Sequence, residues 1–311
     1  MRLCEIDEIC RDTSKIVKFL QDRKVLAREV LCPRCNELMS YDDQKRAFRC
    51  SKRKAVQNGH KKRMSVKCEG YVSLFRGSWF GNIRIPLSTA MRFIGLYLML
   101  NPPRQEFLKF ELAISSNTVV DWSNYVREVL IDWCEEHSVL LGGSGKIVEI
   151  VETNVGHRKY NRGAVAEEKW FFGAFERDSK SHAVKVVEDR SPDTLLDIIK
   201  KWIRPGTTII SDHSKSCHEM SQENYDHLAV EHSINFANPA NGSHKKSMGR
   251  TWRHMKETVQ KYGARDQHFH GYFCEYLFKR AIEFPDRIET FFGVIARTYP
   301  PIATAMPPDS D

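Results

Sequence analysis

Hydrophobic residues recur at helical spacing through much of the chain before residue 140. Residues 13–28 place apolar side chains behind a Thr13/Ser14 cap, which predicts one amphipathic helix. Three further helices are predicted within residues 87–138, one ending at residue 100, one over 105–112 and one over 117–137. The last two, with the small turn between them, have the proportions of a helix-turn-helix.

After residue 146 the apolar positions form short β-branched runs bounded by Gly, Pro or polar turns, which is the pattern of buried strands. The predicted strands cover residues 147–152, 169–175, 182–187 and 207–211. Ser191 caps a predicted helix through Trp202, and another helix is expected over 268–284. This order of strands and helices predicts an α/β fold with an RNase H-like mixed sheet. The run of three glycines and a serine over 142–145 is predicted to be a linker.

Four cysteines between residues 32 and 68 have the pattern of a zinc ribbon. Cys32-Pro-Arg-Cys35 can supply two thiolates to one tetrahedral Zn²⁺, and the second pair must come from an opposing hairpin. Cys50 and Cys68 are the favoured second pair, with His60 as the alternative to Cys68. The insert between them is basic and would lie well on phosphates; it contains Lys52, Arg53, Lys54, Lys61, Lys62 and Arg63. We therefore expect a structural zinc site.

The predicted helix-turn-helix offers a second place for nucleic acid. Its longer helix would present four polar side chains to a major groove: Asn117, Asp121, Asn124 and Arg127. Its apolar side chains would pack inside or between helices: Val120, Trp122, Val126 and Leu130. Helical hairpins of this length are also common in proteins that do not bind DNA, so the pattern leaves both interpretations open.

Composition narrows the class of protein. A chain of 311 residues with 41% hydrophobic residues can bury a full core in two or three modules. A net charge of +8 and a pI near 9.0 fit a polyanionic partner such as nucleic acid. Nine cysteines without an export signal favour reduced thiols and metal ligation over disulfides. The longest apolar run, residues 93–100, is far shorter than the ~20 residues of a membrane span, so we expect no membrane association and no secretion.

A series of motifs resembles, in order, the Merlin superfamily of DDE transposases and its bacterial insertion-sequence relatives. The motifs are Val148-Glu149-Ile150-Val151-Glu152, Arg158-Lys159-Tyr160-Asn161-Arg162-Gly163, Trp170-Phe171-Phe172-Gly173, Pro205-Gly206-Thr207-Thr208-Ile209-Ile210-Ser211-Asp212, His232-Ser233-Ile234-Asn235-Phe236, Gly242-Ser243-His244 and Thr251-Trp252. The resemblance implies carboxylates from separate elements that hold two divalent metals, roughly 3.5–4 Å apart, for DNA cleavage. It also implies a zinc ribbon whose last cysteine shortly precedes a stretch like residues 73–80.

Two of the three catalytic acids that the resemblance implies are replaced in this chain. The first falls at Val151, the second at Asp212 and the third at Gly249. Hard cations such as Mg²⁺ need oxygen ligands in strict geometry, which a valine cannot supply. Glu149 shares a strand face with Val151 but is displaced by ~6–7 Å, and Glu152 points the other way. Asp212 alone is therefore expected to be a weak metal site, and the two glutamates are expected to form a polar strand end.

Basic residues gather around this implied site. The candidate phosphate contacts are Arg158, Lys159 and Arg162 after the first strand, His244 at the family's histidine position, and Arg250, Arg253 and Lys256 on one face of a helix predicted over 251–260. A site that loses two negative charges and gains an arginine attracts phosphate without needing metal. This favours DNA binding over DNA cutting.

Three hypotheses follow from these patterns. The leading one is a transposase-derived DNA-binding protein with a degenerate DDE site, inactive in strand cleavage and transfer. The second is an active transposase that uses Glu149 and Asp212 with Mg²⁺ or Mn²⁺, and the third is a zinc-containing scaffold for protein interactions. DNA is the expected partner, a homodimer is one option for its assembly, and the expected location is the nucleus in a eukaryote and otherwise the cytoplasm. The predicted modules are an N-terminal helix (1–30), a zinc-ribbon-like segment (31–86), a helical region (87–141), an RNase H-like domain (146–298) and a disordered tail (299–311).

Overall fold

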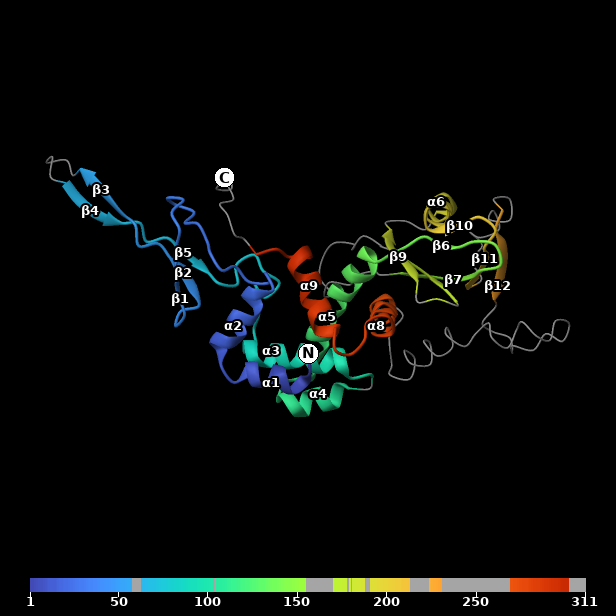
Figure 1. Cartoon of the computed structure of the whole chain (residues 1–311), viewed down its shortest axis with the longest axis horizontal. Coiled ribbons are helices and arrows are strands. Elements are labelled where there is room, and N and C mark those ends of the chain that lie inside the picture. Colours follow the sequence, from blue (N-terminus) through green and yellow to red (C-terminus); the bar gives the residue numbers. More distant parts are fainter. Residues whose placement is uncertain are drawn as a thin grey trace, which may run out of the picture. The chain divides into compact units, whose positions relative to one another are not determined.

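The computed structural model describes residues 1–57, 63–102, 104–154, 170–177, 179, 181–187, 191–212, 224–230 and 269–301, and Figure 1 labels its elements. The chain divides into two compact units. The first comprises Met1–Met99, Phe110–Ala113 and Pro285–Asp311, and the second comprises Leu100–Lys109 and Ile114–Phe284. None of the described helices has both the length and the apolar character needed to cross a membrane.

Four of the described helices lie wholly in the first unit: α1 (Leu3–Cys10), α2 (Thr13–Asp22), α3 (Leu87–Met99) and α9 (Arg287–Thr298). Asp12 caps α2 by accepting a hydrogen bond from the Ser14 N–H at 2.9 Å. The prediction of one helix over 13–28 was wrong, because α2 ends at Asp22 and the N–H groups of Val25 and Leu26 both turn back to the Leu20 carbonyl. The α1 and α9 helices were not predicted.

The first unit also holds two small sheets. Strands β1 (Ser40–Asp42), β2 (Ala47–Arg49) and β5 (Tyr71–Ser73) form an antiparallel sheet in the order β1-β2-β5. Strands β3 (Arg53–Gln57) and β4 (Arg63–Lys67) form a separate antiparallel hairpin. The basic insert between Cys50 and Cys68 is therefore largely this hairpin, which leaves the cysteine-rich segment and returns to it.

The helical region predicted over 87–138 is confirmed by α3, α4 (Gln105–Leu112) and α5 (Ser116–Glu136). Ser115 caps α5 by accepting a hydrogen bond from the Thr118 N–H at 3.1 Å. Within the second unit α5 packs along α8 (Phe269–Ala281), where Trp133 meets the Phe278 ring edge-on at 5.1 Å. Trp122, Val126 and Leu130 are buried as predicted, but Val120 is 46% exposed, so its predicted place inside was wrong.

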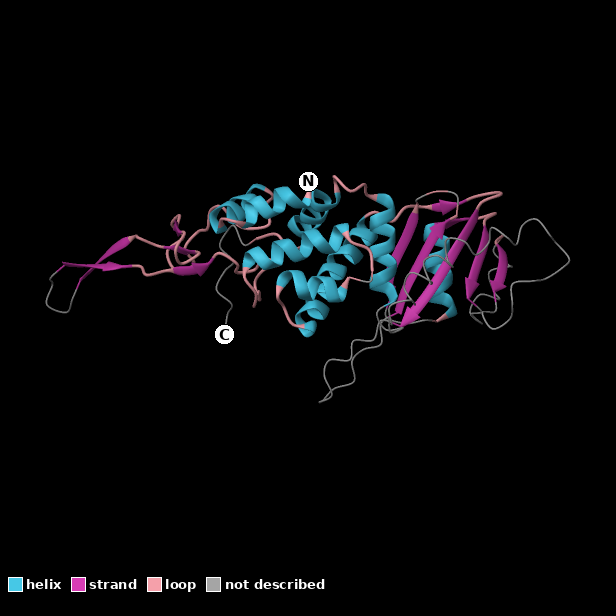
Figure 2. Ribbon diagram, turned by 90° about the horizontal axis from the view of Figure 1, so that it is seen from below, coloured by secondary structure: helices cyan, strands magenta, loops and turns pink. Residues whose placement is uncertain are grey.

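The second unit is built on a five-stranded sheet, whose strands lie side by side in Figure 2. The strands run in the order β12-β11-β7-β8-β9. Strands β7, β8 and β9 are antiparallel neighbours, whereas β11 is parallel to both β7 and β12. Their bounds are β7 (Ile147–Asn154), β8 (Trp170–Glu176), β9 (His182–Val187), β11 (Thr208–Asp212) and β12 (Asp226–Val230). The four predicted strands are confirmed, and β12 is an additional one.

Helices cover both faces of this sheet. On one face, Leu195, Ile198 and Ile199 of α6 (Pro192–Trp202) pack with apolar residues of the sheet, including Val148 and Ile150. On the other face, the Phe175 ring lies 6.4 Å from the Phe273 ring of α8. Ser191 caps α6 by accepting from the Thr194 N–H at 3.2 Å, as the sequence predicted. The fold is therefore a mixed α/β fold.

The predicted linker at Gly142 is instead an ordered part of the second unit. Leu141–Gly142 forms a short strand, β6, parallel to β10 (Ile203–Arg204). The Gly142 N–H donates to Glu176 Oε2 at 3.0 Å, and the Gly143 N–H donates to Thr207 Oγ1 at 2.8 Å. A Cβ at Gly142, whose φ is +77°, would lie 2.1 Å from Thr207 Oγ1. The glycine is needed for close packing, so the prediction of a flexible linker was wrong.

Candidate metal centre and acidic site

The first half of the cysteine cluster is a tight turn. The Cys32 N–H donates to the Glu37 carbonyl and the Asn36 N–H donates to the Cys32 carbonyl, both at 2.8 Å. Asn36 completes the turn with a positive φ of 56°, which asparagine tolerates better than most residues. This backbone brings Cys32 and Cys35 to the same side of the turn, as a Cys-x-x-Cys ligand pair requires.

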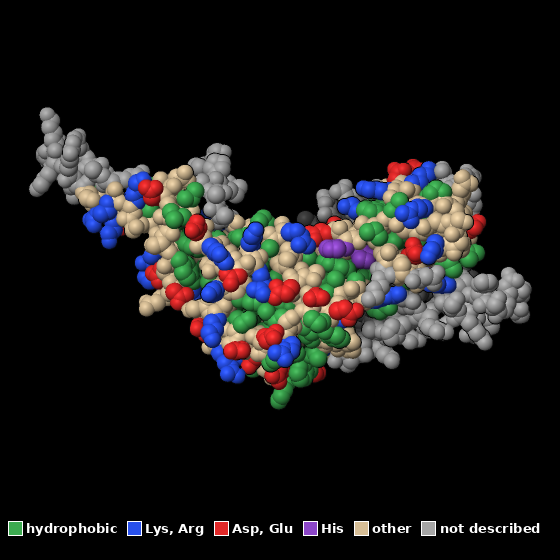
Figure 3. Space-filling view, in the orientation of Figure 1, with side chains coloured by type: hydrophobic (Ala, Val, Ile, Leu, Met, Phe, Trp, Pro, Cys, Tyr) green, Lys and Arg blue, Asp and Glu red, His purple; other side chains and the backbone are tan. Residues whose placement is uncertain are grey.

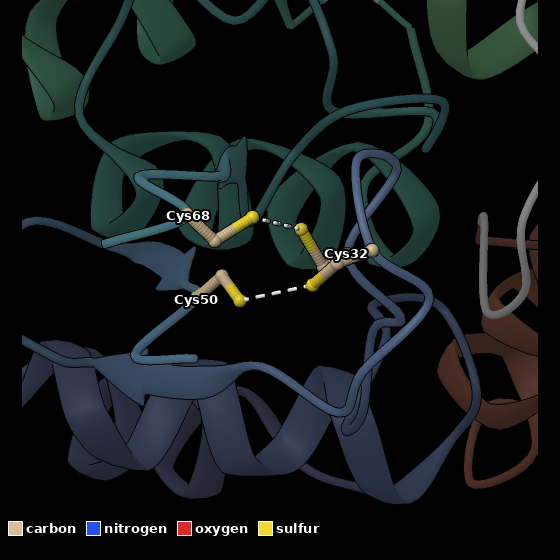
Figure 4. A group of neighbouring side chains, drawn as sticks. Cys32, Cys50 and Cys68 are labelled. Carbon is tan, nitrogen blue, oxygen red and sulfur yellow. Dashed lines mark hydrogen bonds between the residues drawn. The ribbon is translucent and has the colours of Figure 1, made fainter. Parts of the chain in front are cut away.

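The second half is assembled at the base of the β3–β4 hairpin. The Cys50 N–H donates to the Gly70 carbonyl at 2.9 Å, and the Cys68 N–H donates to the Lys52 carbonyl at 2.8 Å. These bonds hold the two cysteines side by side although many residues separate them in the sequence. Figure 4 shows Cys32, Cys50 and Cys68 directed toward one another.

The cluster fits a tetrahedral zinc ion. All four sulfur atoms lie within 4.8 Å of one another, with Cys32 and Cys68 at 3.6 Å and Cys35 and Cys50 at 3.4 Å. Zinc–sulfur bonds of about 2.3 Å imply sulfur–sulfur separations of about 3.8 Å in a tetrahedron. The predicted ligand set Cys32, Cys35, Cys50 and Cys68 is therefore compatible with a structural zinc site, and His60 lies outside the described residues.

The thiols of the cluster have unequal acidities. Burial alone would raise the pKa of Cys32, but the backbone N–H groups of Arg34 and Cys35 and two neighbouring thiols lower it to about 7. The Lys52 N–H lowers the pKa of Cys50, but burial and the other thiols outweigh it and raise the pKa to about 12. Burial also raises the pKa of Cys68. Zinc binding must displace these protons, so zinc affinity should fall as the pH falls.

Gly70 leaves the space that the Cys32 sulfur occupies. A Cβ at this position would lie 2.4 Å from Cys32 Sγ and 3.2 Å from Cys50 Cβ. We expect Gly70→Ala to displace Cys32 and to weaken zinc binding roughly 10–100-fold, the range found when groups that orient metal ligands are changed. Competition with a chromophoric chelator measures this. Gly81→Ala is the matched control, because its Cβ would meet only carbonyl oxygens at 3.1 and 3.3 Å, away from the cysteines. Equal zinc affinities of the two variants would contradict the expectation.

Two positions of the implied acidic site, Val151 and Asp212, fall on parallel strands that run side by side. The recorded register of β7 and β11 ends with Ile150 opposite Ser211, so Val151 and Asp212 are the next residues on the two strands. Asp212 is the last residue of β11 and lies opposite Val230 of β12. The positions that the resemblance assigns to the first and second acids are thus neighbours in the sheet. Gly249, assigned to the third, lies outside the described residues.

Glu149 has a partner inside the protein. It is 4% exposed, and its Oε1 accepts hydrogen bonds from Nε and Nη2 of Arg177 at 2.9 and 2.6 Å. Burial raises the pKa of Glu149, although Arg177 opposes this. The expectation of a polar strand end was therefore wrong for Glu149. Its register partner on β11 is Ile210 rather than Asp212, so it is offset from the position next to Asp212.

One polar pair near Asp212 was not foreseen from the sequence. Ser211 is 3% exposed, and its hydroxyl lies 2.9 Å from Nε2 of His227 on β12. The pair links the two strands immediately before Asp212. The scattered histidines after Asp212 gave no signal of this pair, because His227 reaches Ser211 only when β12 pairs with β11.

The helical candidates for DNA contact differ in exposure. Asn117 and Asp121 are exposed, and Asn124 is half-buried. Arg127 is 12% exposed in its side chain, with its guanidinium 4.1 Å from the Tyr272 ring centre, Nε 3.7 Å from Glu275 and Nη1 bound to Asn124. The DNA-binding role of this helix stays a prediction, and the burial of Arg127 counts against that residue.

The remaining candidate phosphate contacts lie outside the described residues; they are Arg158, Lys159, Arg162, His244, Arg250, Arg253 and Lys256. Among the described residues, Lys and Arg side chains are interspersed with Asp and Glu over much of the face drawn in Figure 3. On this face the charge of the described residues therefore does not by itself mark a DNA-binding surface around the sheet.

Two similarities to known proteins point to transposases. Residues 141–281, a little under half of the chain, match the family model of the ISXO2-like transposase domain. An uncharacterized transposase-like protein of Haemophilus influenzae is 29% identical over 99 residues, which are 31% of this chain and 79% of that protein. These similarities support an insertion-sequence-type transposase family and a transposase-derived function. The family match contains both Val151 and Asp212 and leaves the cysteine cluster outside.

Proposed function

We propose that this chain is a transposase-derived protein that binds DNA and has lost metal-dependent strand cleavage. The observation that carries the proposal is the register of β7 and β11, which makes Val151 and Asp212 neighbours. In a DDE site of the Merlin kind, two acids would occupy these neighbouring positions and hold divalent metals between them. Here one of the two is a valine, so the strand pair offers a single carboxylate.

The sheet supports the RNase H-like part of the proposal. Three antiparallel strands are followed by the helix α6 and by β11, which returns parallel to the first strand of the sheet. This is the succession of strands and helix that an RNase H-like mixed sheet requires. In this arrangement the sheet and α8 are a retained scaffold, and the zinc ribbon and helical region are the parts available for DNA.

The loss of cleavage follows from coordination chemistry. Mg²⁺ demands near-ideal octahedral oxygen geometry and gives up its water reluctantly, so one carboxylate binds it weakly. Glu149 does not replace the missing acid, because its carboxylate is bound to Arg177 and its register partner is Ile210. A DNA backbone held nearby would therefore be bound and not cut.

Strand cleavage and Mn²⁺ binding test the proposal together. With supercoiled plasmid and Mg²⁺ or Mn²⁺, we expect the native chain and Asp212→Ala to show the same background nicking. By electron paramagnetic resonance we expect no tight Mn²⁺ site in the native chain and a new one in Val151→Asp, because the variant would have acids at neighbouring positions of β7 and β11. The second readout does not depend on having the right DNA substrate.

Two results would contradict the proposal. Cleavage by the native chain that Asp212→Ala abolishes would establish the active alternative, in which Glu149 and Asp212 serve catalysis. A lack of binding to duplex DNA would favour a scaffold for protein interactions. Binding that does not weaken as salt rises would favour the same alternative, because phosphate contacts give a negative slope of log affinity against log salt.

A further inference from the structure

The positive charge of the chain is concentrated in one segment. Between Asp43 and Glu69 the sequence has no acid and ten Lys or Arg residues. The whole chain carries +8, so the rest of it carries −2. A clustered basic segment in an otherwise nearly neutral protein is the electrostatic footprint expected of a nucleic-acid contact.

The structure makes ten residues of this segment a two-stranded arm, meaning β3 and β4. Five residue pairs join the strands, from Arg53 opposite Lys67 to Gln57 opposite Arg63. At about 3.4 Å per residue the paired part is about 14 Å long. Arg53, Val66 and Lys67 are exposed, and the Arg53 Nε donates to Ser65 Oγ at 3.0 Å.

The arm is mounted on the cysteine cluster. Cys50 precedes β3 and Cys68 follows β4, and the Cys68 N–H bond to the Lys52 carbonyl closes the base of the arm. Lys52 itself pairs with Glu37 at 2.6 Å, which ties the base to the Cys32–Cys35 turn. A metal ion bound by the four cysteines would thus fix the base of the arm, where the chain enters β3 and leaves β4.

We propose that the arm enters the major groove of duplex DNA, with Arg53 and Lys67 contacting phosphates at the groove edge. The inference rests on the proposed DNA-binding function and identifies the element that carries it. The major groove of B-DNA, about 12 Å wide and about 8.5 Å deep, admits a two-stranded β-ribbon, and the arm is longer than the groove is deep. Arg53 and Lys67 are register partners, so they project from the same face of the ribbon.

The geometry favours DNA over duplex RNA. The major groove of A-form RNA is deep and too narrow for side chains to read, so a β-ribbon cannot enter it. The arm should therefore add to the affinity for duplex DNA and contribute little to the affinity for duplex RNA of the same sequence.

The test is fluorescence anisotropy of the full-length zinc-loaded chain with a labelled 20-base-pair duplex over a range of salt. In R53E/K67E we expect binding to weaken roughly tenfold or more and the slope of log affinity against log salt to fall by about 2, one unit for each lost phosphate contact. Methyl green, which occupies the major groove, should displace the native chain, whereas the minor-groove ligand netropsin should not.

K15E/K18E is the matched control, because both lysines are exposed on α2 of the same unit and the total change in charge is identical. It should bind DNA clearly better than R53E/K67E. Zinc content checks the fold of each variant, and R53Q/K67Q replaces R53E/K67E if the latter loses zinc.

The inference is overturned if the arm variants bind DNA as well as K15E/K18E does, if they lose affinity for duplex RNA to the same extent, or if netropsin alone displaces the chain. In each of these cases the native chain still binds DNA, so the proposed function stands. If the native chain shows no salt-dependent DNA binding, the proposed function itself fails.

Discussion

Cys50→Ser should abolish tight zinc binding and unfold the cysteine-rich segment around β1, β2 and β5. Its sulfur lies 3.4 Å from Cys35 Sγ within the four-cysteine cluster, and serine is a poor ligand for zinc. Structural zinc binding by cysteine clusters contributes about 10–16 kcal/mol near pH 7, and this binding energy is folding energy because the site does not exist in the unfolded chain. Zinc per chain by mass spectrometry and limited proteolysis of residues 30–73 measure the two effects.

Cys4→Ser provides the control for this result. Cys4 is an exposed free cysteine in the same unit, and it does not belong to the cluster. This variant should keep one zinc per chain and native resistance to protease. If Cys50→Ser also kept zinc with native affinity, the assignment of the cluster as a four-thiolate site would be wrong.

Glu275→Gln should destabilise the second unit by about 3–5 kcal/mol, the range found when one partner of a buried ion pair is removed. The Glu275 side chain is 4% exposed and accepts hydrogen bonds from both terminal nitrogens of Arg104 at 2.7 and 2.8 Å and from Lys279 at 2.8 Å. Glutamine keeps the shape but removes the charge, which leaves buried cations facing a neutral group. Urea denaturation followed by tryptophan fluorescence measures the loss.

The pH dependence of stability supplies an independent check. Burial would raise the pKa of Glu275, but Arg104 and Lys279 outweigh it and hold the pKa well below its ordinary value. Because the folded-state pKa is lowered, the stabilisation is present above the ordinary glutamate pKa of about 4.3 and is lost as the pH falls below it. The difference in stability between the native chain and Glu275→Gln should therefore be large at pH 7 and shrink in acid.

Glu106→Gln is the control for the buried pair. Glu106 also pairs with a lysine of the second unit, Lys109 at 2.9 Å, but its side chain is 80% exposed. Exposed pairs of this kind contribute about 0–1 kcal/mol, because water screens them. Equal losses in the two variants would show that burial does not decide the strength of the Glu275 interaction.

Local patterns predicted much of the fold. The Ser191 cap placed α6 close to its observed bounds, and the apolar periodicity after a small turn did the same for α5, because a helix start depends on a few neighbouring residues. The runs of β-branched residues placed β7 and β11, because this strand pattern also depends on a few neighbouring residues. By contrast, β12 has only short, mixed sequence, and its strand character comes from pairing with β11.

The candidate metal site likewise depends partly on local sequence and partly on tertiary structure. The Cys32–Cys35 pair was evident because both ligands come from one turn. Its pairing with Cys50 and Cys68 could be proposed but not established, since the hairpin between them brings the two halves together. Glu275 is a lone acid in the aromatic-rich sequence of α8, and this is a signal that it has a buried partner. Nothing local points to that partner, Arg104, which is 171 residues away in the sequence.

The order of cysteines, the β-branched runs, the capped helices and the replacement of an expected acid by Val151 all follow from the amino-acid sequence, because each depends on residue type and short spacing. Tertiary structure alone decided that Val151 lies beside Asp212, that Glu149 is turned to Arg177 and that Gly142 packs against Thr207. Strand register and buried ion pairs join residues far apart in the chain, and the free energy of such contacts depends on the packing of the whole unit.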